Sequence, residues 1–103
     1  MGLNPKIEEL HALVSSIPRG QVASYGQVGK AMKQPVSGLI VGRWLGRMVG
    51  TDEVPWWRVV SSQGEFVIAK RHPSYAQEQG ERLTGEGIEL TDGRVPPSYF
   101  CDL

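Results

Sequence analysis

The stretch Val54-Pro55-Trp56-Trp57-Arg58-Val59-Val60 organises the rest of this sequence. Its proline restricts its own φ and biases the valine before it toward an extended conformation, while the final β-branched pair is typical of a strand. The two tryptophans therefore follow a rigid turn that leads into a strand. Because successive side chains of an extended segment point to opposite faces, we expect one indole in the core and the other beside a cleft.

Length and composition favour one soluble domain. The chain has 103 residues, of which 40% are hydrophobic and 21% are charged, in the range of ordinary globular proteins. We see no run long enough to span a membrane and no signal peptide, and expect a cytoplasmic protein. Cys101 is the one cysteine, and His11 and His72 match no ligand spacing, so we expect no disulfide, metal or cofactor.

The formal net charge is zero, but the charge is unevenly distributed. Residues 1–71 carry nine basic and five acidic side chains, a balance of +4, and residues 72–103 carry two and six, a balance of −4. The basic part could bind a polyanion. An ordinary surface of mixed charge explains the same numbers of basic and acidic residues, and on charge alone we favour this interpretation over a polyanion-binding site.

Local signals predict a helical N-terminal half. Asn4-Pro5 is a good helix start, and Ser24-Tyr25-Gly26-Gln27 is a capping box that opens a helix to about residue 32. Pro35 is expected to open a third helix that stops before Gly50. The second and third helices form a helix-turn-helix candidate over about residues 24–50.

The C-terminal half reads as a hairpin followed by a helix. Residues 59–68 fit a strand, a turn at Gly64 and a second strand, followed by a basic loop within 66–75. Ser74 and Gln77 fit a second capping box, with Gly87 as the stop of its helix. We therefore predict a mainly α, winged-helix-like helix-turn-helix domain with a small β-hairpin, spanning residues 1–103.

Several motifs carry a family resemblance: Ile17-Pro18-Arg19-Gly20-Gln21-Val22, Ser24-Tyr25-Gly26-Gln27-Val28, Val41-Gly42, and the block Pro55-Trp56-Trp57-Arg58-Val59-Val60. Together they resemble the DNA-binding domain of the O6-alkylguanine-DNA alkyltransferases, over roughly residues 7–99. In those enzymes a nucleophilic cysteine and a histidine follow the proline, and here both positions hold tryptophan. This pattern is similar to the alkyltransferase-like proteins, which bind O6-alkylguanine in DNA without repairing it.

The resemblance implies a non-enzymatic lesion sensor that flips the damaged base through the minor groove and flags it for nucleotide excision repair. Suicide alkyl transfer needs a thiolate, and an indole is a poor nucleophile. We expect Cys101, far from the motif in sequence, to be an inert or surface thiol. The implied partners are duplex DNA containing O6-alkylguanine and nucleotide excision repair proteins, with the protein itself a monomer that binds no membrane.

The resemblance also assigns site residues. The implied lesion pocket consists of Tyr25, Trp56, Trp57, Val59, Lys70 and Arg71. The implied DNA-binding set is Ser24, Tyr25, Ser37, Gly38, Leu39, Gly42, Arg43 and Arg47. Pro55, Arg58 and Glu86 are expected to support the site, and Glu86 either accepts from an indole N–H or faces solvent.

Two positions depart from the family pattern. The arginine finger that fills the gap left by a flipped base falls on Leu39, which can act as an apolar wedge, unless Arg43 one turn further contacts DNA instead. The basic residue that senses the base edge falls on Ala69, and either Lys70 or Arg71 could replace it.

Other functions stay open. A helix-turn-helix regulator would explain residues 24–48 but not the paired tryptophans. A protein-interaction module with weakened DNA binding would explain the departure at Leu39. An active transferase that uses Cys101 is the least favoured hypothesis.

Overall fold

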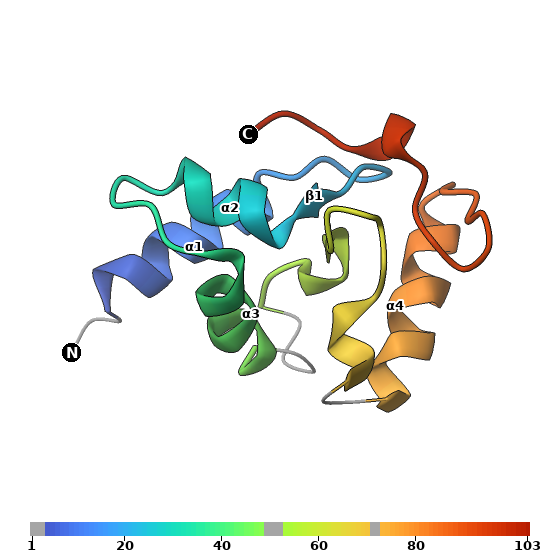
Figure 1. Cartoon of the computed structure of the whole chain (residues 1–103), viewed down its shortest axis with the longest axis horizontal. Helices are drawn as coiled ribbons and strands as arrows, with labels where there is room; N and C mark the ends of the chain where they lie inside the picture. The colour runs from blue at the N-terminus through green and yellow to red at the C-terminus, as the bar shows by residue number, and fades with distance from the viewer. Residues whose placement is uncertain (1–3, 49–52, 71–72) are drawn as a thin grey trace.

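Four α-helices and a two-stranded parallel sheet build the described part of the chain, residues 4–48, 53–70 and 73–103, in the computed structural model (Figure 1). The elements in chain order are α1 Pro5–Ser15, β1 Ala23–Ser24, α2 Tyr25–Ala31, α3 Gly38–Gly46, η1 Trp56–Arg58, β2 Val59–Val60, η2 Val67–Lys70, α4 Pro73–Gly85 and η3 Pro97–Tyr99, where η denotes a 3₁₀ helix. The prediction of a mainly helical, helix-turn-helix fold is confirmed. No helix in the described ranges is long and apolar enough to cross a membrane.

The first two helices begin where their caps predict. The Asn4 side chain accepts from the Lys6 N–H at 2.9 Å, with Pro5 in the first helical position. Both halves of the capping box of α2 are present: the Gln27 N–H donates to Ser24 Oγ at 3.0 Å, and the Ser24 N–H donates to Gln27 Oε1 at 2.8 Å. These bonds satisfy backbone donors that the first turn leaves open.

The third helix begins later than predicted. Ser37, and not the region of Pro35, provides the N-cap, and its Oγ accepts from the Ile40 N–H at 3.3 Å. The turn before it is tight, because a Cβ at Gly29 would collide with the Val36 carbonyl. α3 therefore packs closely across α2 (Figure 1). The expected stop at Gly50 lies outside the described residues.

The predicted hairpin is wrong, because the sheet is parallel and joins two distant segments. Ala23 pairs with Val59 and Ser24 with Val60. The chain does turn after β2, with the Gly64 N–H donating to the Ser61 carbonyl at 2.9 Å, but it then forms η2 instead of a return strand. The Gly64 carbonyl instead accepts from the Val95 N–H at 3.0 Å.

The last ten residues form a strap that lies beside β1 (Figure 1). The Val22 N–H donates to the Tyr99 carbonyl at 2.9 Å, and the Cys101 N–H donates to the Val22 carbonyl at 2.8 Å. Gln27, which caps α2, also donates through Nε2 to the Cys101 carbonyl at 2.8 Å. The C-terminus is thereby tied to the beginning of the helix-turn-helix.

Cys101 is buried in the main apolar cluster and is not a surface thiol. Burial raises the pKa of its thiol above the ordinary value. A raised pKa leaves less thiolate near neutral pH. The expectation of a poorly reactive thiol is therefore consistent with this environment.

The fourth helix begins at Pro73, so Ser74 lies inside it and the predicted capping box is wrong. A proline is well suited to the first helical position, where its missing N–H is not needed. Its C-terminal end is as predicted: Gly87 has φ +94°, its N–H donates to the Thr84 carbonyl at 3.0 Å, and the Ile88 N–H donates to the Leu83 carbonyl at 3.1 Å. This Schellman arrangement places Glu86 at the C-cap.

Gly64 provides a test of the turn after β2. It has φ +79°, and a Cβ there would collide with the Val95 backbone. We expect Gly64→Ala to lower the free energy of unfolding by about 2 kcal/mol or more, measured by urea denaturation. Gly85→Ala is the control, because that glycine ends α4 with open space around it, and it should be neutral or stabilising by up to about 1 kcal/mol. Equal effects of the two substitutions would contradict this account of the turn.

Candidate nucleic-acid interface

An open pocket of about 550 Å³ lies between the helix-turn-helix and the segment that follows β2. One wall comes from the beginnings of α2 and α3, and the other comes from the turn after β2 and from η2. The lining residues are Ser24, Tyr25, Gly26, Gly38, Leu39, Gly42, Ser61, Ser62, Val67 and Ile68. Five of the residues predicted to bind DNA therefore lie around one cavity.

Tyr25 begins α2 and forms the centre of the helical wall. Its Cβ and carbonyl carbon lie so close to Gly38 that a Cβ added there would be 3.2 and 3.3 Å away, and its ring carbons would lie 3.9 Å from a Cβ at Gly42. The small residues of α3 thus let the tyrosine pack between the two helices. Burial raises the pKa of Tyr25 to about 12, so its hydroxyl stays protonated at neutral pH and is a potential hydrogen-bond donor.

The pocket carries exposed apolar side chains on both walls. Leu39, at the beginning of α3, is 66% exposed, and Val67, at the beginning of η2, is 38% exposed. A large, singly exposed leucine is unremarkable by itself, but here it belongs to a cavity lining. Arg43, one turn along α3, is also exposed, as are Arg47 and the cap residue Ser37.

Trp56 and Val59 do not line the open pocket, contrary to the predicted lesion site. Trp56 is 1% exposed, and Val59 is fully buried in the same apolar cluster. The cause is η1: the Arg58 N–H donates to the Pro55 carbonyl at 3.0 Å, so the tryptophans lie on a 3₁₀ turn and not on an extended strand. The Trp56 ring meets the rings of Trp57 and Tyr75 edge-on, with centroids 5.9 and 5.8 Å apart.

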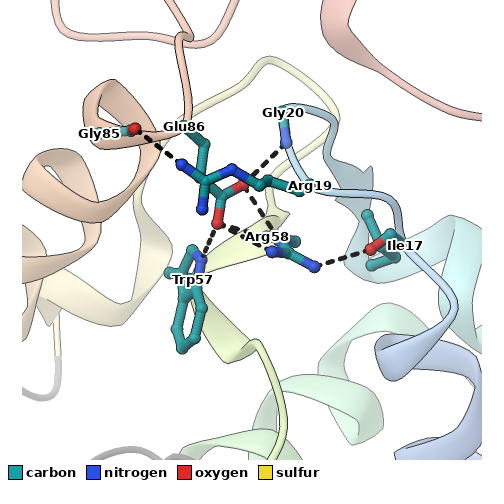
Figure 2. A network of polar contacts seen from close by, with 7 residues as sticks. All are labelled: Ile17, Arg19, Gly20, Trp57, Arg58, Gly85 and Glu86. Atoms are coloured by element: carbon teal, nitrogen blue, oxygen red, sulfur yellow. Dashed lines mark hydrogen bonds and ion pairs between the residues drawn. The ribbon is translucent and has the colours of Figure 1, made fainter.

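Trp57 also lies away from the pocket lining and takes part in a polar network (Figure 2). Its Nε1–H donates to Glu86 Oε2 at 2.8 Å. Arg58 Nε and Nη2 donate to the same carboxylate at 3.0–3.1 Å, and Arg58 Nη1 donates to the Ile17 carbonyl at 2.9 Å. The Gly20 N–H completes the set, donating to Glu86 Oε1 at 2.8 Å. Of the two possibilities for Glu86, acceptance from an indole is the one observed.

The network joins three parts of the chain around one carboxylate. Figure 2 shows Glu86 at the end of α4 pointing toward η1 and toward the loop that holds Ile17 and Gly20. Burial by itself raises the pKa of Glu86, but hydrogen bonds from Arg58, Gly20 and Trp57 outweigh it and lower that pKa below the ordinary value. The carboxylate is therefore ionised at neutral pH, opposite Arg58.

A cation also covers the Trp57 ring. The Arg82 guanidinium carbon lies 4.3 Å from the centroid of the Trp57 ring, within the usual range for a cation–π contact. Arg82 Nε is also 3.1 Å from Glu78 on the same helix. Trp57 thus connects η1 to α4, as a supporting residue and not as a wall of the cavity.

The remaining predicted pocket residues are only partly described. Lys70 ends η2, and Arg71 lies outside the described residues. The prediction missed Gly26, Ser61, Ser62, Val67 and Ile68. The sequence signal for Val67 and Ile68 is the apolar pair after the Gly64 turn, which fits a strand equally well. Among the described residues, no group of three His, Cys, Asp or Glu side chains could hold a metal ion.

Comparison with known protein families identifies the domain. Residues 7–88 match the family model of the 6-O-methylguanine DNA methyltransferase DNA-binding domain. The chain belongs to this family. The matched range includes the helix-turn-helix, both walls of the pocket and Glu86.

Alignments with other members of this DNA-binding-domain family cover most of the chain. A DNA base-flipping protein of Vibrio parahaemolyticus is 32% identical over 82% of this chain and 81% of its own length. Alkyltransferase-like protein 1 of Schizosaccharomyces pombe is 34% identical over 80% of this chain and 75% of its own. The crystal structure of S. pombe Atl1 in complex with damaged DNA containing O6-carboxymethylguanine matches with a TM-score of 0.84 and 28% identity over the whole of both chains.

The polar network of this family member predicts a specific pH dependence. Because the Glu86 pKa is lower in the folded state, its contribution to stability is present above the unfolded-state pKa and is lost as pH falls through the folded-state value. We expect Glu86→Gln to lower the free energy of unfolding by about 3 kcal/mol at pH 7. The difference in the free energy of unfolding between the wild type and Glu86→Gln should decrease below about pH 4.

Urea denaturation over that pH range measures both effects. Glu89→Gln is the matched control, because Glu89 is exposed on the segment just after α4 and lies outside the network. If the difference in the free energy of unfolding between wild type and Glu86→Gln did not change with pH, the lowered pKa assigned to Glu86 would be contradicted.

Proposed function

We propose that this protein is a non-enzymatic sensor of O6-alkylguanine that binds duplex DNA and flips the damaged nucleotide into the pocket beside α2 and α3. The observation that carries the proposal is the cavity itself, bounded by Tyr25 and the small residues of α3. Two relatives add support. One is named a DNA base-flipping protein, and the other has been crystallised with DNA containing an O6-alkylated guanine.

The pocket has the character that a flipped base requires. Enzymes and sensors of this kind hold the extruded base between apolar or aromatic walls with a few polar groups. Here Val67 and Ile68 provide an apolar wall, and the polar residues Ser61 and Ser62 belong to the same lining. The protonated Tyr25 hydroxyl is a further donor.

Leu39 is suited to occupy the space that the base leaves. Apolar side chains inserted between base steps stabilise kinked or opened duplexes in many minor-groove proteins. Leu39 is exposed at the mouth of the pocket, on the helix that also presents Arg43 and Arg47. The arginines are placed to contact phosphates, so affinity should decrease as salt increases.

We also propose that Trp56 takes the position of the transferase cysteine and that the bound complex marks the lesion for nucleotide excision repair. An indole in that position leaves no nucleophile for alkyl transfer. Cys101 does not replace it, because it is buried in the apolar cluster beside Val22 and is not part of the pocket lining.

Binding titrations test the sensor function. We expect tighter binding to a duplex with one O6-methylguanine than to the same duplex with guanine, because the lesion weakens pairing and eases extrusion. Leu39→Ala should lower affinity for the lesion duplex about tenfold through loss of the wedge, whereas Leu39→Arg should strengthen binding overall. The control is Leu103→Ala, an exposed leucine outside the pocket lining. Equal wild-type affinity for both duplexes would refute the proposal.

A transfer assay tests the absence of chemistry. After incubation with DNA carrying a radiolabelled methyl group on O6 of guanine, we expect no label on the protein. The label should stay on the DNA because the pocket offers hydroxyls but no thiolate. Label recovered on Cys101 would identify an active transferase instead.

A further inference from the structure

The indole nitrogen of Trp56 is a buried hydrogen-bond donor with no acceptor among the described residues. The residue is 1% exposed, and its Nε1 has no hydrogen-bond partner in the described part of the chain. Its neighbour differs in this respect, because the Trp57 Nε1–H donates to Glu86 at 2.8 Å. Buried donors in folded proteins are nearly always satisfied, and an exception indicates a strained or functional position.

The Trp56 side chain shares an apolar cluster with two residues of the pocket lining. Trp56 belongs to the apolar cluster that also contains Ile68, and Tyr25 packs against the same cluster. Both Ile68 and Tyr25 line the open cavity, whereas Trp56 does not. The Ile68 side chain is therefore shared by the two environments, and its movement could open the cavity toward the tryptophan.

We propose that the Trp56 Nε1–H recognises a hydrogen-bond acceptor on the O6 substituent of the flipped guanine, so that the sensor prefers substituents carrying an oxygen to purely aliphatic ones. This inference depends on the proposed lesion binding and specifies its ligand class: O6-hydroxyalkyl and O6-carboxyalkyl guanines. The step requires the Ile68 side chain to move aside as the substituent enters. O6-carboxymethylguanine, present in the crystal structure of the related Atl1 complex, carries such an acceptor.

The size of the preference follows from the state of the donor before binding. Trp56 Nε1 gives up no bond to another described residue when the ligand arrives, so the new hydrogen bond is offset mainly by the desolvation of the ligand's oxygen. Satisfying a buried donor of this kind corresponds to roughly a tenfold change in affinity or more. An aliphatic substituent of the same length would fill the same space and leave the donor unsatisfied.

The experiment compares duplexes containing O6-(2-hydroxyethyl)guanine and O6-propylguanine, which differ only by an oxygen in place of a terminal methyl group. We expect the wild type to bind the hydroxyethyl duplex roughly tenfold more tightly. Trp56→Phe, which keeps an aromatic ring and removes the N–H, should bring the ratio close to one. Trp57→Phe is the matched control, because its indole N–H is already bonded to Glu86, and it should keep the wild-type ratio even if its overall affinity changes.

A second measurement on the wild type does not depend on the folding of a variant. In ¹⁵N NMR spectra the indole N–H resonance of Trp56 should move downfield on binding the hydroxyethyl duplex and move less with the propyl duplex. A hydroxyethyl-to-propyl ratio near one in a protein that still prefers O6-methylguanine over guanine would overturn this inference and leave the sensor function intact. Loss of all lesion preference would instead overturn the proposed function.

Discussion

One buried carboxylate, that of Glu86, holds together the parts of the chain that the site depends on. It receives hydrogen bonds from Trp57, Arg58 and the Gly20 backbone, and Arg58 extends the network to Ile17. The Schellman end of α4 brings this side chain to η1, and η1 in turn directs Trp56 into the core. Removing the charge would leave Arg58 only partly compensated in a half-buried environment, which is why the arrangement is strongly specified.

The two tryptophans in the central motif have separate tasks as a result. The Trp57 N–H donates to Glu86 and its ring contacts Arg82, so Trp57 fixes the position of η1 relative to α4. Trp56 is buried, yet its Nε1 has no hydrogen-bond partner in residues 4–48, 53–70 and 73–103. A site that must hold an apolar core together and still recognise a ligand can use such a residue, because its ring supports the fold while its N–H stays available.

The N-terminal caps of α1 and α2 and the end of α4 could be predicted from the sequence, whereas features that depend on distant pairing could not. The cap of α2 and the stop at Gly87 rest on contacts three to five residues apart, so their residue types were sufficient. The residues of the helical wall of the pocket were predicted from the family resemblance instead, because Tyr25 contacts Gly38 and Gly42 across two helices. The opposite wall was missed because Val67 and Ile68, a short apolar run, fit a strand as well as a 3₁₀ turn. The parallel pairing of β1 with β2 joins residues about 36 positions apart and leaves no local pattern.

The C-terminal strap has a consequence for how the protein is made. The Val22 backbone is hydrogen-bonded to the backbones of Tyr99 and Cys101, and the capping residue Gln27 donates to the Cys101 carbonyl. During translation these partners leave the ribosome well after residues 22–27 have emerged. Contacts of such high sequence separation form late in folding. A nascent chain therefore lacks the bonds that lock the first turn of α2, and a truncated product ending before the strap would present an incompletely anchored DNA-binding helix.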